Sequence, residues 1–171
     1  MESNTHHTNW QVLIVRPRSE KKTGRRLCQM GFETCVPTQW QYRQWSDRRK
    51  KTEVVLFPNY VFIAADPARR NEVFQAGNIL RYLRIGGCIA TLSEKETAMI
   101  RRLAHLEAPV QIAYEGFRGG EEVEVLSGSL TGYRGLVTGV NGARRLQVAL
   151  PGLGCFAQVE LRDTEVRRIS V

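Results

Sequence analysis

The last 53 residues of the chain, 119–171, contain nine glycines set among short runs in which apolar and polar residues alternate. These runs include EEVEVL, GYRGLVTGV, RRLQVAL and CFAQVEL, and the pair Asn141-Gly142 is typical of a hairpin turn. An α-helix loses about 1 kcal/mol for each interior glycine relative to alanine. We therefore expect residues 119–171 to form a small all-β barrel and not a helical domain.

The first half of the chain has a different pattern. The run WQVLIVRP (10–17) predicts a buried strand that ends at a proline. Ser19 is a candidate N-cap for a helix that runs to about Met30, with Gly31 as its C-cap. The segments 32–45 and 52–66 predict two strands around a charged tip, 46–51, and together they form a hairpin.

The next part of the chain alternates again between helix and strand. A short helix is expected from Ala68 to Ala76, and a strand over 79–87. Ser93 and Glu96 have capping-box spacing, so a second helix should begin there. This order predicts an α+β fold, with an antiparallel sheet flanked by helices over 9–106, a linker over 107–118 and the barrel over 119–171.

The most apolar stretch of the chain, LFPNYVFI (56–63), contains a proline and an asparagine, which are rare inside strands. From Tyr60 the side chains alternate, so Tyr60 and Phe62 lie on one face and Val61 and Ile63 on the other. Both faces are apolar. A core explains one face, and the second face is either further core or a surface that binds a partner.

The charge of the chain is concentrated at one end. Residues 9–106 contain 18 lysines and arginines against 8 acidic residues, a net charge of +10, whereas residues 119–171 contain 6 of each. Such asymmetry predicts a polyanion as the partner of the first part and a different partner for the second.

Enzymatic and metal chemistry have little support in the sequence. Four cysteines lack zinc-ligand spacing and are expected to be buried free thiols, and only His105 of the three histidines lies outside the polar N-terminal tail. No phosphate-binding loop, GxGxxG or GxSxG motif occurs. We expect no catalytic residue, metal or cofactor. With no signal peptide and no apolar run of membrane-spanning length, we expect a cytoplasmic protein without a membrane partner.

Two motifs carry a resemblance to a known family. GEEVEVLSGSLTGYRGLVTGV (120–140) resembles the KOW motif, and LFPNYVFI resembles the signature of the NGN domain. Over residues 9–170 the chain therefore resembles the NusG superfamily of bacterial transcription elongation factors, in which an NGN domain precedes an SH3-like KOW barrel. WSDRRKKTEVVLFPNYVF (45–62) is also similar to the specialised paralogs RfaH and, more closely, the UpxY-type antiterminators of capsular polysaccharide operons. The KOW spacing is carried by Gly120, Val123, Gly128, Gly132, Gly135 and Val137.

The resemblance implies a docking site for RNA polymerase. NGN domains of this family bind the clamp helices of the β′ subunit through an apolar depression. The alternative for the aromatic residues of this site is that they fill the core of the domain. The positions that match are Ile14, Phe57, Pro58, Tyr60, Phe62 and Ile85.

The resemblance also implies contact with the non-template DNA strand in the transcription bubble. A solvated helix face is the alternative for these basic residues, and the tip DRRKK (47–51) is either a solubilising hairpin end or a contact to upstream DNA or nascent RNA. The polymerase β gate loop is a further candidate partner, but Asn71-Glu72-Val73 stands where RfaH has His-Thr-Thr. The DNA-binding positions are Arg16, Arg18, Lys22, Arg25 and Arg26.

The function implied is antitermination in selected operons by a monomeric factor that suppresses pausing or termination, with ribosomal protein S10 as a candidate partner of the KOW domain. Two alternatives stay open. One is a general NusG-type elongation factor that serves all genes and links to the termination factor Rho. The other is a KOW-type RNA-binding module that acts without polymerase.

Overall fold

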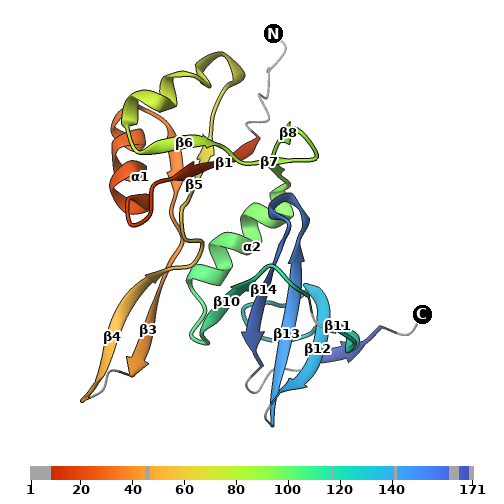
Figure 1. Ribbon diagram of the computed structural model, residues 1–171. Helices are drawn as coiled ribbons and strands as arrows, with labels where there is room; N and C mark the ends of the chain where they lie inside the picture. The colour runs from red at the N-terminus through yellow and green to blue at the C-terminus, as the bar shows by residue number, and fades with distance from the viewer. Residues whose placement is uncertain (1–8, 45–46, 117, 141, 162–165, 170–171) are drawn as a thin grey trace. The chain divides into compact units, whose positions relative to one another are not determined.

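The computed structural model describes residues 9–44, 47–116, 118–140, 142–161 and 166–169 (Figure 1). The chain divides into two compact units. The first comprises Met1–Val36 and Phe57–Thr97, and the second comprises Pro37–Leu56 and Ala98–Val171. The second unit therefore takes in the hairpin and residues 98–106, which the sequence pattern had grouped with the first domain. The domain boundaries drawn from the sequence stay predictions.

The first unit is built on an antiparallel sheet. Its strands lie in the order β2 (Glu33–Cys35), β5 (Tyr60–Ala64), β1 (Trp10–Val15) and β6 (Ile79–Tyr82), and β9 (Thr91–Leu92) also pairs with β1. Helix α1 (Glu20–Gln29) packs on one face of this sheet (Figure 1). The apolar side chains of that face and of the helix form the core: Leu13, Val15, Leu27, Phe32, Val61, Ile63, Ala65, Val73, Ala76 and Tyr82.

Both ends of α1 lie where the sequence predicts them. At the C-terminal end, Gly31 has φ +83° and donates to the carbonyl of Cys28 at 3.0 Å, while Phe32 donates to that of Leu27 at 3.1 Å. These two bonds are the Schellman motif. At the N-terminal end Ser19 occupies the N-cap position, but its hydroxyl donates to the Arg16 carbonyl and not to the helix. The N-cap residue is therefore the predicted one, but its side chain stabilises the turn before the helix and does not cap the helix.

The stretch 52–66, predicted as one strand, is two strands in separate sheets: β4 (Arg49–Val55) and β5. A turn separates them, in which Tyr60 N–H donates to the Phe57 carbonyl at 3.2 Å. Pro58 and Asn59, with φ +66° at Asn59, occupy the central positions, as in a type II turn. The proline therefore needs no ladder bond. The turn is held because Asn59 N–H donates to the carboxylate of Glu20 at 2.8 Å.

The segment 68–76 is not the α-helix that the sequence predicts. It forms two 3₁₀ turns, η1 (Pro67–Arg69) and η2 (Glu72–Ala76), and Gly77 with φ +72° ends the second. The first turn begins where Asp66 Oδ1 accepts the Ala68 N–H at 2.8 Å. Val73 and Ala76, three residues apart in η2, both lie in the core.

Helix α2 (Glu94–Ala104) begins with the predicted capping box. Ser93 N–H donates to Glu96 Oε2 at 2.9 Å, and Glu96 N–H donates to Ser93 Oγ at 3.2 Å. This reciprocal pair satisfies two backbone donors at the helix end. Before it, the predicted strand 79–87 is divided into β6 and β7 (Arg84–Ile85), and β7 pairs with β8 (Cys88–Ile89) around the turn Gly86-Gly87.

The second unit contains a six-stranded antiparallel sheet and a separate hairpin. The segment 107–118, expected to be a linker, contributes β10 to the sheet by pairing with β14. A strand of four residues is too short to distinguish from a loop by its sequence pattern. The closure of the sheet into an SH3-like barrel stays a prediction. The sheet order is β10 (Val110–Ala113), β14 (Cys155–Glu160), β13 (Ala143–Leu150), β12 (Arg134–Val140), β11 (Glu121–Val125) and β15 (Val166–Arg168), with η3 (Pro151–Leu153) between β13 and β14.

Two glycines of this sheet have defined roles. A Cβ at Gly135 would lie 2.2 Å from the carbonyl oxygen of Gln147 on β13, so no larger residue fits there without moving backbone. The β12–β13 ladder extends to the pair Val140–Ala143, and Gly142 has φ +78°, as the predicted hairpin turn requires. Asn141, the other residue of that turn, lies outside the described residues.

None of the four cysteines forms a disulfide, as expected, but three are not buried. Cys28 and Cys88 are exposed, Cys35 is half-buried, and only Cys155 lies in a core. Cys28 is on the outer side of α1 and Cys88 follows a glycine turn, so neither position faces apolar packing. Among the described residues, no helix has both the length and the apolar character needed to cross a membrane.

Candidate functional site

The six residues predicted to contact polymerase fall into three pairs in the structure. Phe57 and Phe62 are interior side chains that expose 2% and 1% of their surface. Their rings meet edge-on, with centroids 5.3 Å apart and planes at 83°. Edge-to-face pairs of this kind stabilise a core beyond the area they bury. For these two residues the structure therefore matches the core alternative that the sequence left open.

Ile14 and Tyr60 form the more accessible group. They are direct partners in the β1–β5 ladder, and Ile14 is also paired with Arg81 on β6. Residues directly opposite one another point to the same side of a sheet. Because Leu13 and Val61 face the α1 side, the band Tyr60–Ile14–Arg81 lies on the opposite face. Ile14 and Tyr60 are half-buried and Arg81 is exposed. The band offers apolar surface flanked by a cation.

The two remaining docking candidates lie near the ends of strands. Pro58 is exposed in the turn that leads into β5. Ile85 on β7 is 42% exposed, and β7 follows Leu83, whose N–H donates to the carbonyl of Val12 at 2.8 Å. The structure thus places Ile14 on β1 opposite Tyr60 on β5, with Pro58 in the turn that leads into β5, while Ile85 lies on the separate β7–β8 ladder.

The five predicted DNA-binding cations share an exposed region of the first unit. Arg16 and Arg18 lie in the turn before α1, and Arg18 has φ +61°. Lys22, Arg25 and Arg26 are on α1 at spacings of three and four residues, so they project from one side of the helix. All five are exposed, and none forms an ion pair with a carboxylate in the described part of the chain. Unneutralised cations in such a cluster favour binding of a polyanion.

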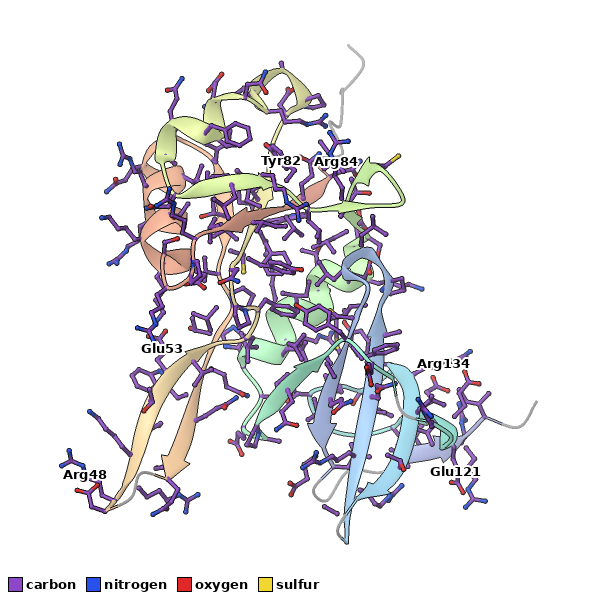
Figure 2. The ribbon with its side chains drawn as sticks, in the orientation of Figure 1. Arg48, Glu53, Tyr82, Arg84, Glu121 and Arg134 are labelled. Atoms are coloured by element: carbon purple, nitrogen blue, oxygen red, sulfur yellow. The ribbon has the colours of Figure 1, made fainter. Side chains whose placement is uncertain are left out.

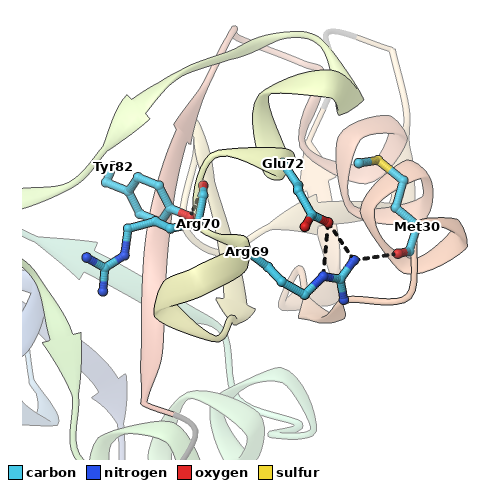
Figure 3. Close-up of polar contacts among 5 residues, drawn as sticks. All are labelled: Met30, Arg69, Arg70, Glu72 and Tyr82. Carbon is cyan, nitrogen blue, oxygen red and sulfur yellow. Dashed lines mark hydrogen bonds and ion pairs between the residues drawn. The ribbon is translucent and has the colours of Figure 1, made fainter.

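The stretch aligned with the gate-loop contact is used in the packing of the first unit (Figure 3). Arg69 pairs with Glu72 at 2.9 Å and donates to the Met30 carbonyl at 3.2 Å, and its guanidinium lies 4.2 Å from the centroid of the Phe32 ring. Val73, next in sequence, is fully buried. Only Asn71 of the three aligned residues is exposed.

Tyr82 closes the same region from β6. Its hydroxyl donates to the carbonyl of Arg70 at 3.0 Å, as Figure 3 shows. Burial raises the pKa of the Tyr82 phenol, and the nearby charge of Arg70 opposes that rise. The phenol therefore stays neutral and anchors the turn that carries η2.

Two ion pairs join β15 to β11 in the C-terminal sheet. Arg167 on β15 contacts Glu124 on β11 at 2.7 Å, and Arg168 contacts Glu121 at 2.7 Å. The hydrogen bond from Arg167 lowers the pKa of Glu124, with further help from the charges of Arg167 and Arg134. Figure 2 labels Glu121 and Arg134, which belong to the neighbouring strands β11 and β12. This part of the chain presents compensated charge.

Sequence reasoning missed one surface. Trp40 and Tyr42 on β3 (Thr38–Gln44) are each 61% exposed, and cations from β4 lie over both rings. The signal was the spacing of two aromatic residues in the run QWQYRQ, which places them on one face of a strand.

Comparison with known proteins gives the family. Residues 8–103 match the model of the NusG family, described as transcription termination factor nusG. The chain is 31% identical over 151 residues to the transcription termination/antitermination protein NusG of Thermus thermophilus, which covers 79% of each sequence. The fold is similar to that of NusG from Thermotoga maritima, solved in a study of domain interaction, with a TM-score of 0.61 and 21% identity over 95% of this chain and 97% of that chain.

The structure is therefore a mixed α+β protein with the NusG fold. From the family match and the Thermus relative together, the chain belongs to the NusG family.

Proposed function

We propose that this protein is a transcription elongation factor of the NusG type that binds RNA polymerase through an NGN domain (9–106), followed by a KOW domain (119–171). The observation that carries the proposal is that the family match over residues 8–103 contains the band Tyr60–Ile14–Arg81. The band is half-buried apolar surface on a sheet, and such surface is suited to a helical partner.

In this proposal, the clamp helices of the polymerase β′ subunit pack on the band. An aromatic anchor in a partly preformed site contributes about 2 kcal/mol or more to binding. Tyr60 supplies that anchor with Ile14 opposite it and Pro58 in the turn before β5, and Ile85 on β7 extends the site. Phe62 is next to Tyr60 on the same face of β5, and its edge contact with Phe57 fixes that strand. Binding one conformation of the clamp in preference to the open one suppresses pausing.

The cations of α1 and of the preceding turn bind the non-template DNA strand in the bubble. The five cations predicted for this contact, Arg16, Arg18, Lys22, Arg25 and Arg26, are exposed and form no ion pair among the described residues, which supports this role. Together with the similarity of residues 45–62 to RfaH and the UpxY-type factors, this favours antitermination in selected operons, such as those for capsular polysaccharide. The paired charges of the C-terminal sheet favour a protein partner there, with ribosomal protein S10 as the candidate.

A general NusG function is the second candidate. The relative from Thermus thermophilus, which matches over 79% of this chain, is named as a termination/antitermination protein without restriction to particular operons. Genome-wide occupancy distinguishes the two functions. A general factor occupies most transcribed genes, whereas a specialised factor occupies a few operons.

A run-through assay on a template with a strong pause tests polymerase-dependent function. We expect the wild-type protein to increase run-through and Tyr60→Ala to abolish both this effect and association with polymerase. Tyr114→Ala is a matched control, because Tyr114 is a 63% exposed ring outside the proposed site. Full activity of folded Tyr60→Ala would contradict the proposed docking site.

A further inference from the structure

The hairpin of β3 and β4 has one face that the proposed function does not use. The ladder runs from Thr38–Val55 to Gln44–Arg49, and side chains alternate between its two faces. Gln39 and Gln41 lie on one face, and Trp40 and Tyr42 lie on the other.

The glutamine face is packed within its own unit. Gln39 is only 3% exposed, and its Nε2 donates to the carbonyls of Leu106 and Ala108 at 2.7 and 2.9 Å. Its Oε1 accepts the N–H of Val110 at 3.0 Å and the Nε2 of Gln41 at 2.7 Å. The hairpin is thereby fixed by one face, so the orientation of the opposite face does not depend on a ligand.

The opposite face carries two large rings in solvent. Trp40 and Tyr42 each expose 61% of their surface, and as alternate residues of one strand they stand about 6.8 Å apart. Single exposed aromatic residues are common on protein surfaces. Two exposed aromatic rings on one face of a preformed hairpin form a surface on which planar groups can stack.

A cation from β4 lies over each ring. The guanidinium carbon of Arg49 lies 4.7 Å from the centroid of the Tyr42 ring, and Lys51 Nζ lies 5.9 Å from that of Trp40. In the ladder Lys51 is opposite Tyr42 and Arg49 is opposite Gln44, so each cation reaches its ring diagonally. The same ring-and-cation unit therefore occurs twice along the hairpin. We call Trp40, Tyr42, Arg49 and Lys51 the aromatic face.

The charge around the aromatic face is positive. Residues 47–55 contain four cations, Arg48 to Lys51, against Asp47 and Glu53. Figure 2 shows Arg48 at the far end of the hairpin and Glu53 nearer its base. Glu53 is opposite Trp40 in the ladder and is the carboxylate on this face. The positive charge is therefore concentrated toward the tip, where an anionic chain would enter.

Rings that alternate with cations match the chemistry of a single-stranded nucleic acid. Its unpaired bases can stack on aromatic rings while its phosphates contact the neighbouring cations. A duplex does not offer its base faces to such rings, because they are stacked inside the helix. An acidic peptide would use the cations and leave the rings without a role.

We propose that the aromatic face of the β3–β4 hairpin binds single-stranded RNA. The choice of RNA rests on the proposed function, in which the cations of the other unit hold the non-template DNA. A transcribing polymerase exposes two single strands, the non-template DNA and the nascent RNA, so the nascent RNA is left for the aromatic face.

Binding of the full chain to a fluorescein-labelled RNA of about 12 nucleotides, measured by anisotropy without polymerase, tests this inference. We expect truncation of both rings, Trp40→Ala with Tyr42→Ala, to weaken binding by on the order of tenfold for each ring. Tyr114→Ala, which removes a similarly exposed ring of the same unit, should bind as the wild type does. Circular dichroism establishes that the variants remain folded.

Two further variants separate stacking from charge. Trp40→Phe with Tyr42→Phe keeps both rings and should retain most of the binding. Arg49→Gln with Lys51→Gln should lower the slope of log affinity against log salt by about 0.7 for each phosphate that the protein no longer neutralises. Undiminished binding of the folded double alanine variant would overturn the inference.

Competitor strands test the identity of the ligand. RNA of matching sequence should compete better than single-stranded DNA or duplex RNA. Equal competition by DNA would overturn the RNA assignment, and preference for duplex would overturn the stacking model. Tyr60→Ala is in the other unit and should leave RNA binding intact. Loss of RNA binding and loss of polymerase docking can therefore be observed separately.

Discussion

Tyr60 lies directly opposite Ile14 in the β5–β1 ladder with part of its ring exposed, whereas Phe62, two residues along the same face, is covered edge-on by Phe57. One strand therefore carries an accessible aromatic side chain and a buried one on the same side. The two rings should respond differently to removal.

We expect Phe62→Ala to lower the free energy of unfolding by about 3–5 kcal/mol, because it leaves a cavity beside Phe57. Tyr60→Ala should cost about 1 kcal/mol, as a half-buried position does. Urea denaturation of the two variants measures the difference. Equal and large losses would show that Tyr60 is a core residue and would contradict its role as a docking anchor.

Charge reversal at Arg25 and Arg26 should reduce antitermination more than it reduces association with polymerase. Both side chains are exposed on α1 and lack an ion pair within the described chain, so reversal should leave the fold unchanged. Run-through and polymerase binding are measured on the same variant. Reversal at Arg101 and Arg102, also exposed on a helix, is the control for net charge. Parallel losses in both assays would argue against a separate DNA contact.

Gly135→Ala should destabilise the C-terminal sheet by about 1–3 kcal/mol, because the new methyl group would meet the Gln147 carbonyl on β13. Gly139→Ala on the same strand is the matched control, since a Cβ there has no heavy atom within 4 Å. Hydrogen exchange of the β12 and β13 amides reports the effect locally. Similar exchange in both variants would mean that the sheet relaxes around the added methyl.

Ser93→Ala should destabilise the start of α2 by about 1 kcal/mol, because it removes the acceptor for the Glu96 N–H. Glu96→Gln retains a side-chain acceptor for Ser93 N–H and should preserve most of the cap, whereas Glu96→Ala should not. Amide exchange in the first turn of α2 measures the three variants. The prediction fails if Glu96→Gln and Glu96→Ala behave alike.

The Glu124–Arg167 pair should make the C-terminal sheet sensitive to acid. The pKa of Glu124 is lower in the folded protein than its ordinary value of 4.5, so its stabilisation is present above that value. It is lost as pH falls through the folded pKa. The stability difference between wild type and Glu124→Gln should therefore shrink on acidification. Glu122→Gln, a change at an exposed neighbour, controls for the loss of one carboxylate. A difference that is constant with pH would contradict this interpretation.

Local features of the fold could be predicted from the sequence. The capping box at Ser93 and Glu96, the helix end at Gly31 and the hairpin turn at Gly142 each depend on a few neighbouring residues. The glycine-rich pattern after residue 118 likewise predicted β structure, because glycine disfavours helix at every such position. Each of these features is formed by residues close together in sequence, within one turn or one hairpin, so the local sequence is enough to predict it.

The positions of the candidate site residues were only partly predictable. The sequence placed Tyr60 and Phe62 on one face of a strand, but the coverage of Phe62 by Phe57 depends on a turn at Pro58 and Asn59. That turn is held by Glu20, which lies on α1 and far away in sequence. The exposed rings of Trp40 and Tyr42 were similarly decided by Gln39, whose bonds reach residues 106–110.

The sequence by itself determined the α+β class, the family and the chemistry available on each segment, because these follow from residue type and spacing. Only the tertiary structure decided which apolar faces are covered, which segment joins which sheet, and which charges are paired. Each of these outcomes depends on residues distant in the chain that meet only after folding. The burial of a side chain and the pairing of a charge therefore depend on contacts between distant segments and cannot be read from one segment alone.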